Sequence, residues 1–258
     1  MCCFAGAAPA GWFRRATLKV AGTEIFARRD GAEQLLAYSM RLSSRSDVAM
    51  ILPLPVAAAT GAAAGTVADD ALHFIDLHEY PQLFTDLDYC WNPPLTASRG
   101  RAVSGAIPQR RQLVVHNVGS FEASFVPTLR DFDRLDARFR LSDEVWAELP
   151  QYRDYSFAVF KLKAAELQQP HPMAFRFPTR DPERLFFPTV HVHDGRVHKK
   201  ARFDHTLYYQ GRPDGVGQPS LMPVTTFVKL DRTHGLVSDA PVFRATLHGK
   251  LPNQDTWV

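Results

Sequence analysis

The sequence predicts an α+β fold, a largely antiparallel β-sheet with a few short helices, and three observations carry this prediction. Segments in which apolar and polar residues alternate outnumber segments with helical spacing. The 258 residues include 18 phenylalanines and 19 prolines, which favour strands and loops over long helices. No regular alternation of strand and helix is present, so a parallel sheet of repeated strand–helix–strand units is not expected.

The first part of the chain is predicted to be rich in strands. Turn residues separate the first three strands, and Leu83, Phe84 and Leu87 have the spacing of a helix face. The predicted strands cover 16–28, 34–42, 48–56 and 72–77, and the helix covers 80–89. A segment rich in proline, serine, glycine and arginine follows at 92–107 and is predicted to be a loop or hinge. The expected organisation is therefore a β-rich region at 1–91 and an α+β region at 108–258, or one continuous domain.

The second part adds a strand, two short helices and further strands. Thr128 and Asp131 have the spacing of a capping box, and Ser142 is a candidate cap for a second helix that ends at Pro150. The predicted strands cover 113–126, 155–163, 173–177, 185–193, 197–209, 225–230 and 242–251.

Composition and targeting signals limit the classes of function. The formal net charge is +3 and charges of both signs are interleaved, so no nucleic-acid partner is expected. The stretch 48–68 is uncharged, but Pro53, Pro55, Gly61 and Gly65 indicate a strand followed by a loop rather than a membrane span. No secretory signal pattern is present at the start, so we expect a cytoplasmic protein that does not enter a membrane.

Several short segments in the first ninety residues match a known pattern. They read Cys2-Cys3-Phe4, then Ile25-Phe26 with Asp30-Gly31, then Tyr38, and then Ala49-Met50-Ile51-Leu52-Pro53-Leu54-Pro55-Val56. This arrangement resembles a largely exported bacterial domain family of unknown function, which starts near a Cys-Gly-Gly-Phe-Phe-Cys motif and continues to a Leu-Pro-Val-Pro strand. The present chain lacks the Gly-Gly pair and spaces its cysteines differently. The resemblance implies no reaction.

Two adjacent cysteines at the start suggest a first kind of site. If Met1 is removed, Cys2 becomes the terminal residue, and its own α-amine can take the proton of its thiol. Cys2 would then be the catalytic nucleophile of an N-terminal-nucleophile amidohydrolase. Alternatively, Cys2 and Cys3 supply thiolate ligands to copper or zinc, with Cys90 as a third ligand. A third possibility is that the cysteines are small buried apolar residues.

Histidines near an Asp-Gly pair suggest a second kind of site. Asp194-Gly195 is a two-residue hairpin signal, because a type I′ turn needs positive φ at both central positions. In such a hairpin His191, His193 and His198 share one face and can bind a divalent metal ion, with zinc the first candidate. A histidine-x-histidine strand with a third histidine on its neighbour resembles the metal-site arrangement of α-type carbonic anhydrases.

The same register has consequences for the neighbouring residues. It places His205 on the core side, so His205 is excluded from the predicted site. Lys200 and Arg202 continue along the histidine face and would repel a cation. A solvent-facing histidine cluster without a ligand is therefore the alternative to a metal site.

Three classes of function remain open at this point. The first is a metal-binding protein or metal-dependent enzyme with zinc or copper as its cofactor and an unknown small molecule as its ligand. The second is the amidohydrolase that uses Cys2, and the third is a non-catalytic binding or scaffold protein. The sequence does not indicate the oligomeric state.

Overall fold

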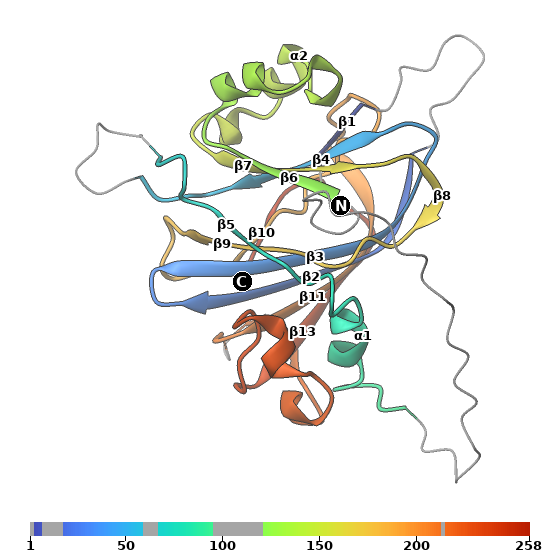
Figure 1. The fold of residues 1–258 in the computed structure, drawn as a ribbon, viewed down its shortest axis with the longest axis vertical. Helices are drawn as coiled ribbons and strands as arrows, with labels where there is room; N and C mark the ends of the chain where they lie inside the picture. Colours follow the sequence, from blue (N-terminus) through green and yellow to red (C-terminus); the bar gives the residue numbers. More distant parts are fainter. Residues whose placement is uncertain (1–2, 7–17, 59–66, 95–120, 213–214) are drawn as a thin grey trace, which may run out of the picture.

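Two β-sheets pack face to face, with short helices on the outer face of each, and the described residues also form a small two-stranded sheet (Figure 1). A computed structural model of the chain describes residues 3–6, 18–58, 67–94, 121–212 and 215–258. The four layers follow one another as helices, small sheet, large sheet and helices. The sheet-rich architecture predicted from the sequence is therefore present.

The small sheet has an antiparallel arrangement with β4 and β7 at its centre. In spatial order its described strands are β1 (Cys3–Ala5), β4 (Val48–Leu54), β7 (Ser156–Leu162) and β6 (Phe121–Val126). Met50 and Leu52 of β4 pack toward the large sheet, whereas Ala49 and Ile51 pack toward the helices. Because both faces of β4 are buried, the strand is apolar throughout. This burial accounts for much of the uncharged stretch at 48–68, and no described helix is long and apolar enough to cross a membrane.

The large sheet is mixed. In spatial order its described strands are β12 (Gln218–Pro219), β13 (Val242–Pro252), β11 (Lys200–Gln210), β2 (Lys19–Asp30), β3 (Glu33–Ser44), β9 (Met173–Pro178) and β5 (His73–Ile75), and β8 (Ala165–Gln168) also pairs with β3. The pairing of β2 with β11 is parallel, and the other pairings within the described part of this sheet are antiparallel. The predicted antiparallel character is thus correct for most of the sheet but not for its centre.

The helices are short and lie in two groups. One group covers the small sheet: η1 (Leu129–Arg134), η2 (Ala137–Phe139), α2 (Asp143–Ala147) and η3 (Pro150–Tyr152). The other group covers the large sheet: α1 (Leu83–Asp88), η4 (Val224–Thr226) and η5 (Leu230–Thr233). The predicted capping box at Thr128 and Asp131 is formed, although it begins a 3₁₀ helix.

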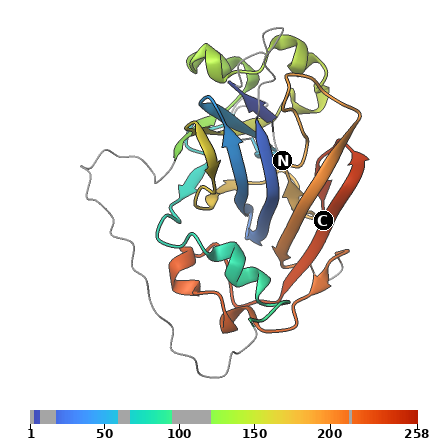
Figure 2. The ribbon, with the colours of Figure 1, turned by 90° about the vertical axis from the view of Figure 1, so that its right-hand side faces the viewer.

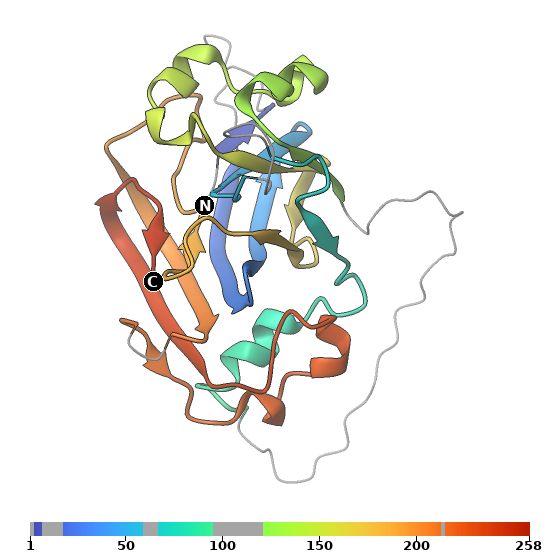
Figure 3. The same ribbon diagram turned by 90° about the vertical axis from the view of Figure 1, so that its left-hand side faces the viewer.

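Strands from both parts of the chain alternate within each sheet. In the small sheet β4 pairs with β7, and in the large sheet β2 pairs with β11 and β3 with β9. The regions 1–91 and 108–258 therefore share both sheets and the core between them (Figure 3).

Two predicted strands have a different structure. In the segment 185–193 only β10 (Phe186–Phe187) is a strand, and it pairs with β14 (Thr256–Trp257). The segment 225–230 contains the end of η4, because the amides of Phe227 and Val228 bond locally to the carbonyl of Val224. The predicted loop at 92–107 and the start of the strand at 113–126 lie mostly outside the described residues.

Candidate functional site: a buried histidine cluster

The predicted histidine hairpin is wrong, because the segment between β10 and β11 is an irregular loop. Gly195 has φ of +72°, but Asp194 does not adopt the left-handed conformation that a type I′ turn also requires there. Within the described residues, the strand contact of Val190–His198 is a single bridge between Val192 and Cys3. We refer to residues 188–199 as the histidine loop.

The C-terminal segment of the chain holds the first half of the histidine loop. Asn253 Oδ1 accepts a hydrogen bond from the His191 amide at 2.7 Å, and Asn253 Nδ2 donates to the carbonyls of His191 and His198 at 2.9 Å each. Asp255 Oδ1 accepts from the amides of Thr189 and Val190 at 2.9 and 3.2 Å. These bonds take the place of the cross-strand ladder that a hairpin would have supplied.

A buried tyrosine completes this anchor. The hydroxyl of Tyr152, at the end of η3, donates to Asp255 Oδ2 at 2.6 Å. The Asp255 carboxyl group is enclosed, and this burial raises its pKa to about 6 even though hydrogen bonds to the carboxylate oppose the shift. The helix layer above the small sheet is thereby connected to the histidine loop.

The loop brings two of its histidines against a third from β11. Nε2 of His191 lies 3.3 Å from Nε2 of His205, and the two rings are nearly parallel. The ring of His193 stacks on that of His191 with centroids 5.4 Å apart. Phe203 contacts His191 and His205, and Phe4 meets His193 edge to face. We call His191, His193 and His205 the histidine cluster.

Burial keeps the cluster uncharged. Loss of hydration lowers the pKa of His191 to about 2 and that of His193 to about 4, and it shifts the pKa of His205 far below its ordinary value. At neutral pH all three imidazoles are therefore neutral, and each has one unprotonated ring nitrogen, the form that a hydrogen-bond acceptor or a metal ligand needs.

Asp204 determines which nitrogen of His205 carries the proton. The Asp204 amide donates to His205 Nδ1 at 3.3 Å, so the proton of neutral His205 resides on Nε2 and points to His191. Asp204 Oδ1 lies 3.6 Å from the same Nδ1 and has no hydrogen-bond partner among the described residues. If His205 instead carries its proton on Nδ1, Asp204 Oδ1 can accept a hydrogen bond from Nδ1, and the lone pair of Nε2 can bind a ligand.

His198 does not join the cluster. Its exposed ring pairs with Asp194, with Nε2 3.0 Å from Oδ2. Lys200 and Arg202 alternate with Phe203 and His205 along β11, so they lie on the opposite face of the strand from the cluster. The expected repulsion of a cation by these two residues therefore does not apply to the site that the structure contains.

The cysteines are separated from one another. Cys3 packs with Ile51 and Val192 between the small sheet and the helices, whereas Cys90 packs beside α1 on the outer face of the large sheet. Burial and the nearby carboxylates Asp86 and Asp88 raise the pKa of Cys90 to about 11, which disfavours the thiolate that a metal ligand needs. Cys90 therefore cannot complete a ligand set with Cys3.

Cys2 lies outside the described residues. Its suggested roles, as the nucleophile of an amidohydrolase and as a thiolate ligand, stay predictions.

The described residues contain no group of three or more histidine, cysteine, aspartate or glutamate side chains arranged to hold a metal ion. What they do contain is the close pair His191 and His205, with the largely buried His193 beside it. Nε2 of His193 has no hydrogen-bond partner in the described part of the chain. Sequence reasoning missed His205, Asp204 and Asp255, because each joins the site through residues distant in sequence or through the opposite face of its strand.

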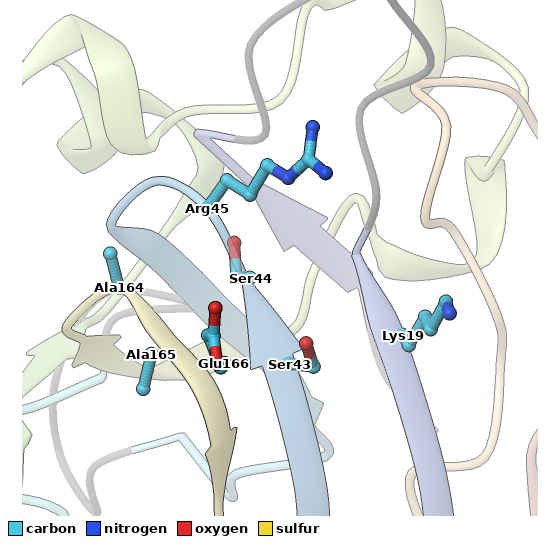
Figure 4. A pocket seen from close by; sticks show the side chains of 7 residues that line it. All are labelled: Lys19, Ser43, Ser44, Arg45, Ala164, Ala165 and Glu166. Carbon is cyan, nitrogen blue, oxygen red and sulfur yellow. The ribbon is translucent and has the colours of Figure 1, made fainter.

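A surface pocket at the end of β3 offers a second arrangement of polar groups (Figure 4). It is lined by Lys19, Ser43, Ser44, Arg45, Ala164, Ala165 and Glu166. The side chain of Arg45 extends away from Glu166, and Lys19 lies across the sheet from both (Figure 4). The hydroxyl of Ser44 already bonds the carbonyl of Ser46. These groups do not converge on one point, so the histidine cluster is the better candidate site.

Comparison with known proteins gives little further guidance. No protein-family description and no curated protein matches the chain. A crystal structure of a mutated baculovirus P35 after caspase cleavage is similar at 14% identity and a TM-score of 0.38, covering 74% of this chain and 66% of that chain. A caspase-8/P35 complex is similar at 13% identity and a TM-score of 0.34, covering 74% and 63%. The chain spans less than two thirds of either of those chains, and similarities this slight carry no argument about its fold or function.

Proposed function

We propose that the protein binds a divalent metal ion, zinc ahead of copper, through Nε2 of His191 and Nε2 of His205. The distance between these two atoms carries the proposal. Zinc–nitrogen bonds of about 2.0–2.1 Å in a tetrahedral site place the ligand nitrogens about 3.3–3.4 Å apart. The two nitrogens of the cluster are separated by 3.3 Å.

The protonation state of the cluster supports the same conclusion. A histidine ligand must be neutral, and burial lowers the pKa of His191 and of His193 well below 7. At neutral pH a metal ion therefore does not have to compete with a proton that would make either imidazole cationic. Imidazole donors suit zinc and copper(II), whereas the side chain of Cys3, a softer sulfur donor, packs on the other side of the small sheet.

Asp204 supplies the partner that a metal-bound histidine usually has. A histidine that binds a metal through Nε2 commonly donates its Nδ1 proton to a carboxylate or carbonyl. Asp204 Oδ1 is the nearby acceptor for His205, while Asp204 Oδ2 is fixed by the Gly22 amide at 2.7 Å. The inaccessible Oδ1 atom of the half-exposed Asp204 gains a hydrogen-bond donor when His205 carries its proton on Nδ1.

His193 is the candidate for the third ligand. Its ring lies against that of His191, and its Nε2 is without a hydrogen-bond partner among the described residues. Rotation of this side chain toward the pair would give three imidazoles and leave a fourth position for water or a small molecule. Such an open position is what metal-assisted hydrolysis requires.

Elemental analysis tests the proposal directly. The protein is purified without a histidine tag, dialysed against zinc, and its metal content is measured together with that of His205→Ala and His191→Ala. We expect about one zinc per chain in the wild type and a loss of most of it in both variants. Cobalt(II) titration followed by visible absorption reports the geometry, because tetrahedral cobalt absorbs far more strongly than octahedral cobalt.

His198→Ala is the matched control, since it removes an exposed histidine from the same loop. Zinc content should be unchanged in this variant. A wild-type protein that remains metal-free at excess zinc would show that the pair is a hydrogen-bonded core element and would reject the proposal. Retention of zinc by folded His205→Ala would also reject it.

A further inference from the structure

The large sheet ends in an open strand edge. β13 is the outer long strand of this sheet, with β11 on one side (Figures 2 and 3). On its other side the short strand β12 pairs only with Phe243 and Arg244. Within the described part of the chain, no strand pairs with this side of β13 from Ala245 to Pro252. Outward-facing backbone N–H and C=O groups of this stretch can therefore accept a further strand.

The inner face of this edge is apolar and incompletely covered. Phe243, Ala245 and Leu247 are partly buried and pack against the core between the sheets. Leu251, which follows on the same side by alternation, is also only half buried. An added strand with apolar residues at alternate positions would cover this row and remove more apolar surface from water.

The outer face of the same edge is basic. Arg202 of β11 and Lys250 of β13 are directly opposite each other in the register, and both are exposed. Like charges in this position repel, and neither side chain forms an ion pair with a described residue. Asp204 lies on the same face and offsets part of this charge. The three cations Lys200, Arg202 and Lys250 outnumber it, so this face of the edge keeps a positive balance.

We propose that the β13 edge binds an extended acidic peptide segment of a partner protein by strand addition. An added strand alternates its side chains between the two faces. Residues on its outer face would lie beside His248 and Lys250, and residues on its inner face would lie beside Leu247 and Leu251. The edge thus specifies a segment in which acidic and apolar residues alternate, with backbone hydrogen bonds supplying affinity and the charges supplying selectivity.

A second copy of this chain is a poorer occupant. If two β13 strands paired antiparallel on the open edge around Lys250, the Lys250 side chains of the two copies would face each other, and these like charges would repel. An acidic segment would instead place a negative charge beside Lys250, so this contact would be attractive. The charge of the edge therefore selects against self-pairing and for an acidic partner.

Binding of a synthetic peptide tests the proposal. The probe is a labelled peptide of alternating glutamate and valine, and its anisotropy is measured against the full chain and against Lys250→Glu and Arg202→Glu. We expect measurable binding that weakens with salt and that falls about tenfold or more in either variant. Lys229→Glu is the matched control, because it makes the same charge change on the helix layer and should leave affinity unchanged.

Backbone methylation of the peptide separates strand addition from simple charge attraction. Methyl groups on the amides of one alternate set should abolish binding, whereas methylation of the other set should not, because only one set faces β13. Equal binding of both methylated peptides, or of a peptide with the same composition in blocks, would overturn the proposal. Absence of binding at millimolar peptide would also overturn it and would leave the cations as protection of the edge against self-association.

Discussion

His193 and His198 lie five residues apart on the histidine loop and have opposite environments. The first half of the loop, residues 189–193, is held at its backbone by Asn253 and Asp255, and its histidines are buried and uncharged. The second half, residues 194–198, has one such bond, from Asn253 Nδ2 to the His198 carbonyl, and the exposed side chain of His198 pairs with Asp194. The same residue type is thus a candidate ligand at one end and a surface residue at the other.

The difference teaches that distant contacts, and not the local sequence, position these histidines. The anchoring bonds connect residues more than sixty positions apart. If these contacts define the site, their removal should affect the first half of the loop strongly and the second half weakly. The predictions below test this contrast, from the largest expected effect to the smallest.

Asp255→Ala should have the largest effect on stability. It removes the acceptor of the Thr189 and Val190 amides and of the Tyr152 hydroxyl, and buried donors without partners cost about 1–3 kcal/mol each. We expect the free energy of unfolding to fall by about 3–5 kcal/mol in urea titrations. Asp255→Asn is the matched control, because its amide oxygen still accepts from the backbone and its loss should be well under half as large. Equal losses would show that the charge, and not the acceptor geometry, anchors the loop.

The sequence predicts the regular parts of this molecule better than it predicts the site. The strands β2 and β3 follow from alternation and from Asp30-Gly31, where Gly31 has φ of +58°. A short turn joins β2 directly to β3, so residues that are neighbours in the sequence suffice to specify this pair of strands. The sequence also predicts a strand at β4, and the structure adds that both its faces are buried.

The histidine loop could not be predicted because its decisive partners are not local. Asp194-Gly195 has a strong hairpin signal, yet the bonds to Asn253 and Asp255 impose another backbone path. The sequence correctly predicts His205 on the core side of β11, and that side is where the cluster forms. Alternation gives the face of a strand, but it does not show which distant side chains meet on that face.

Acid should destabilise the fold through the first half of the loop. Each clustered histidine has a folded pKa below its ordinary value of 6.5, so its contribution to stability is present above pH 6.5 and is lost as the pH falls. Asp255 acts in the opposite direction, because its folded pKa of about 6 is above the ordinary value of 3.8. Near pH 5, unfolding should therefore take up about three protons at the histidines and release about one at Asp255.

For these four groups the net uptake of about two protons corresponds to about 2–3 kcal/mol of stability per pH unit. Two other groups act in opposite directions, because burial lowers the pKa of His171 and raises the pKa of Glu24 to about 7. Urea titrations across the range from neutral to mildly acidic pH measure this slope. His193→Gln should reduce the uptake by about one proton. A slope identical to that of the wild type would show that His193 is not buried in solution.

Asn253→Ala should have an intermediate effect. It removes three hydrogen bonds to the loop backbone, two at His191 and one at His198, in a partly exposed setting. We expect a loss of about 1–2 kcal/mol and faster hydrogen exchange at the His191 amide. The exposed side chain of the neighbouring Gln254 provides the control, and Gln254→Ala should change neither quantity. Unchanged hydrogen exchange at the His191 amide in Asn253→Ala would show that Asp255 alone holds the backbone of the first half of the loop.

His198→Ala should have the smallest effect, and this expectation completes the contrast between the two halves. The ring of His198 and the carboxylate of Asp194 are both more than half exposed, at 57% and 56%. Exposed pairs of this kind contribute about 0–1 kcal/mol, because water screens the attraction and both side chains lose freedom. We therefore expect a loss below about 0.5 kcal/mol that disappears in high salt. A loss comparable to that of Asn253→Ala would mean that the His198 side chain anchors the loop as firmly as the Asn253 bonds do, and the comparison from which these predictions start would fail.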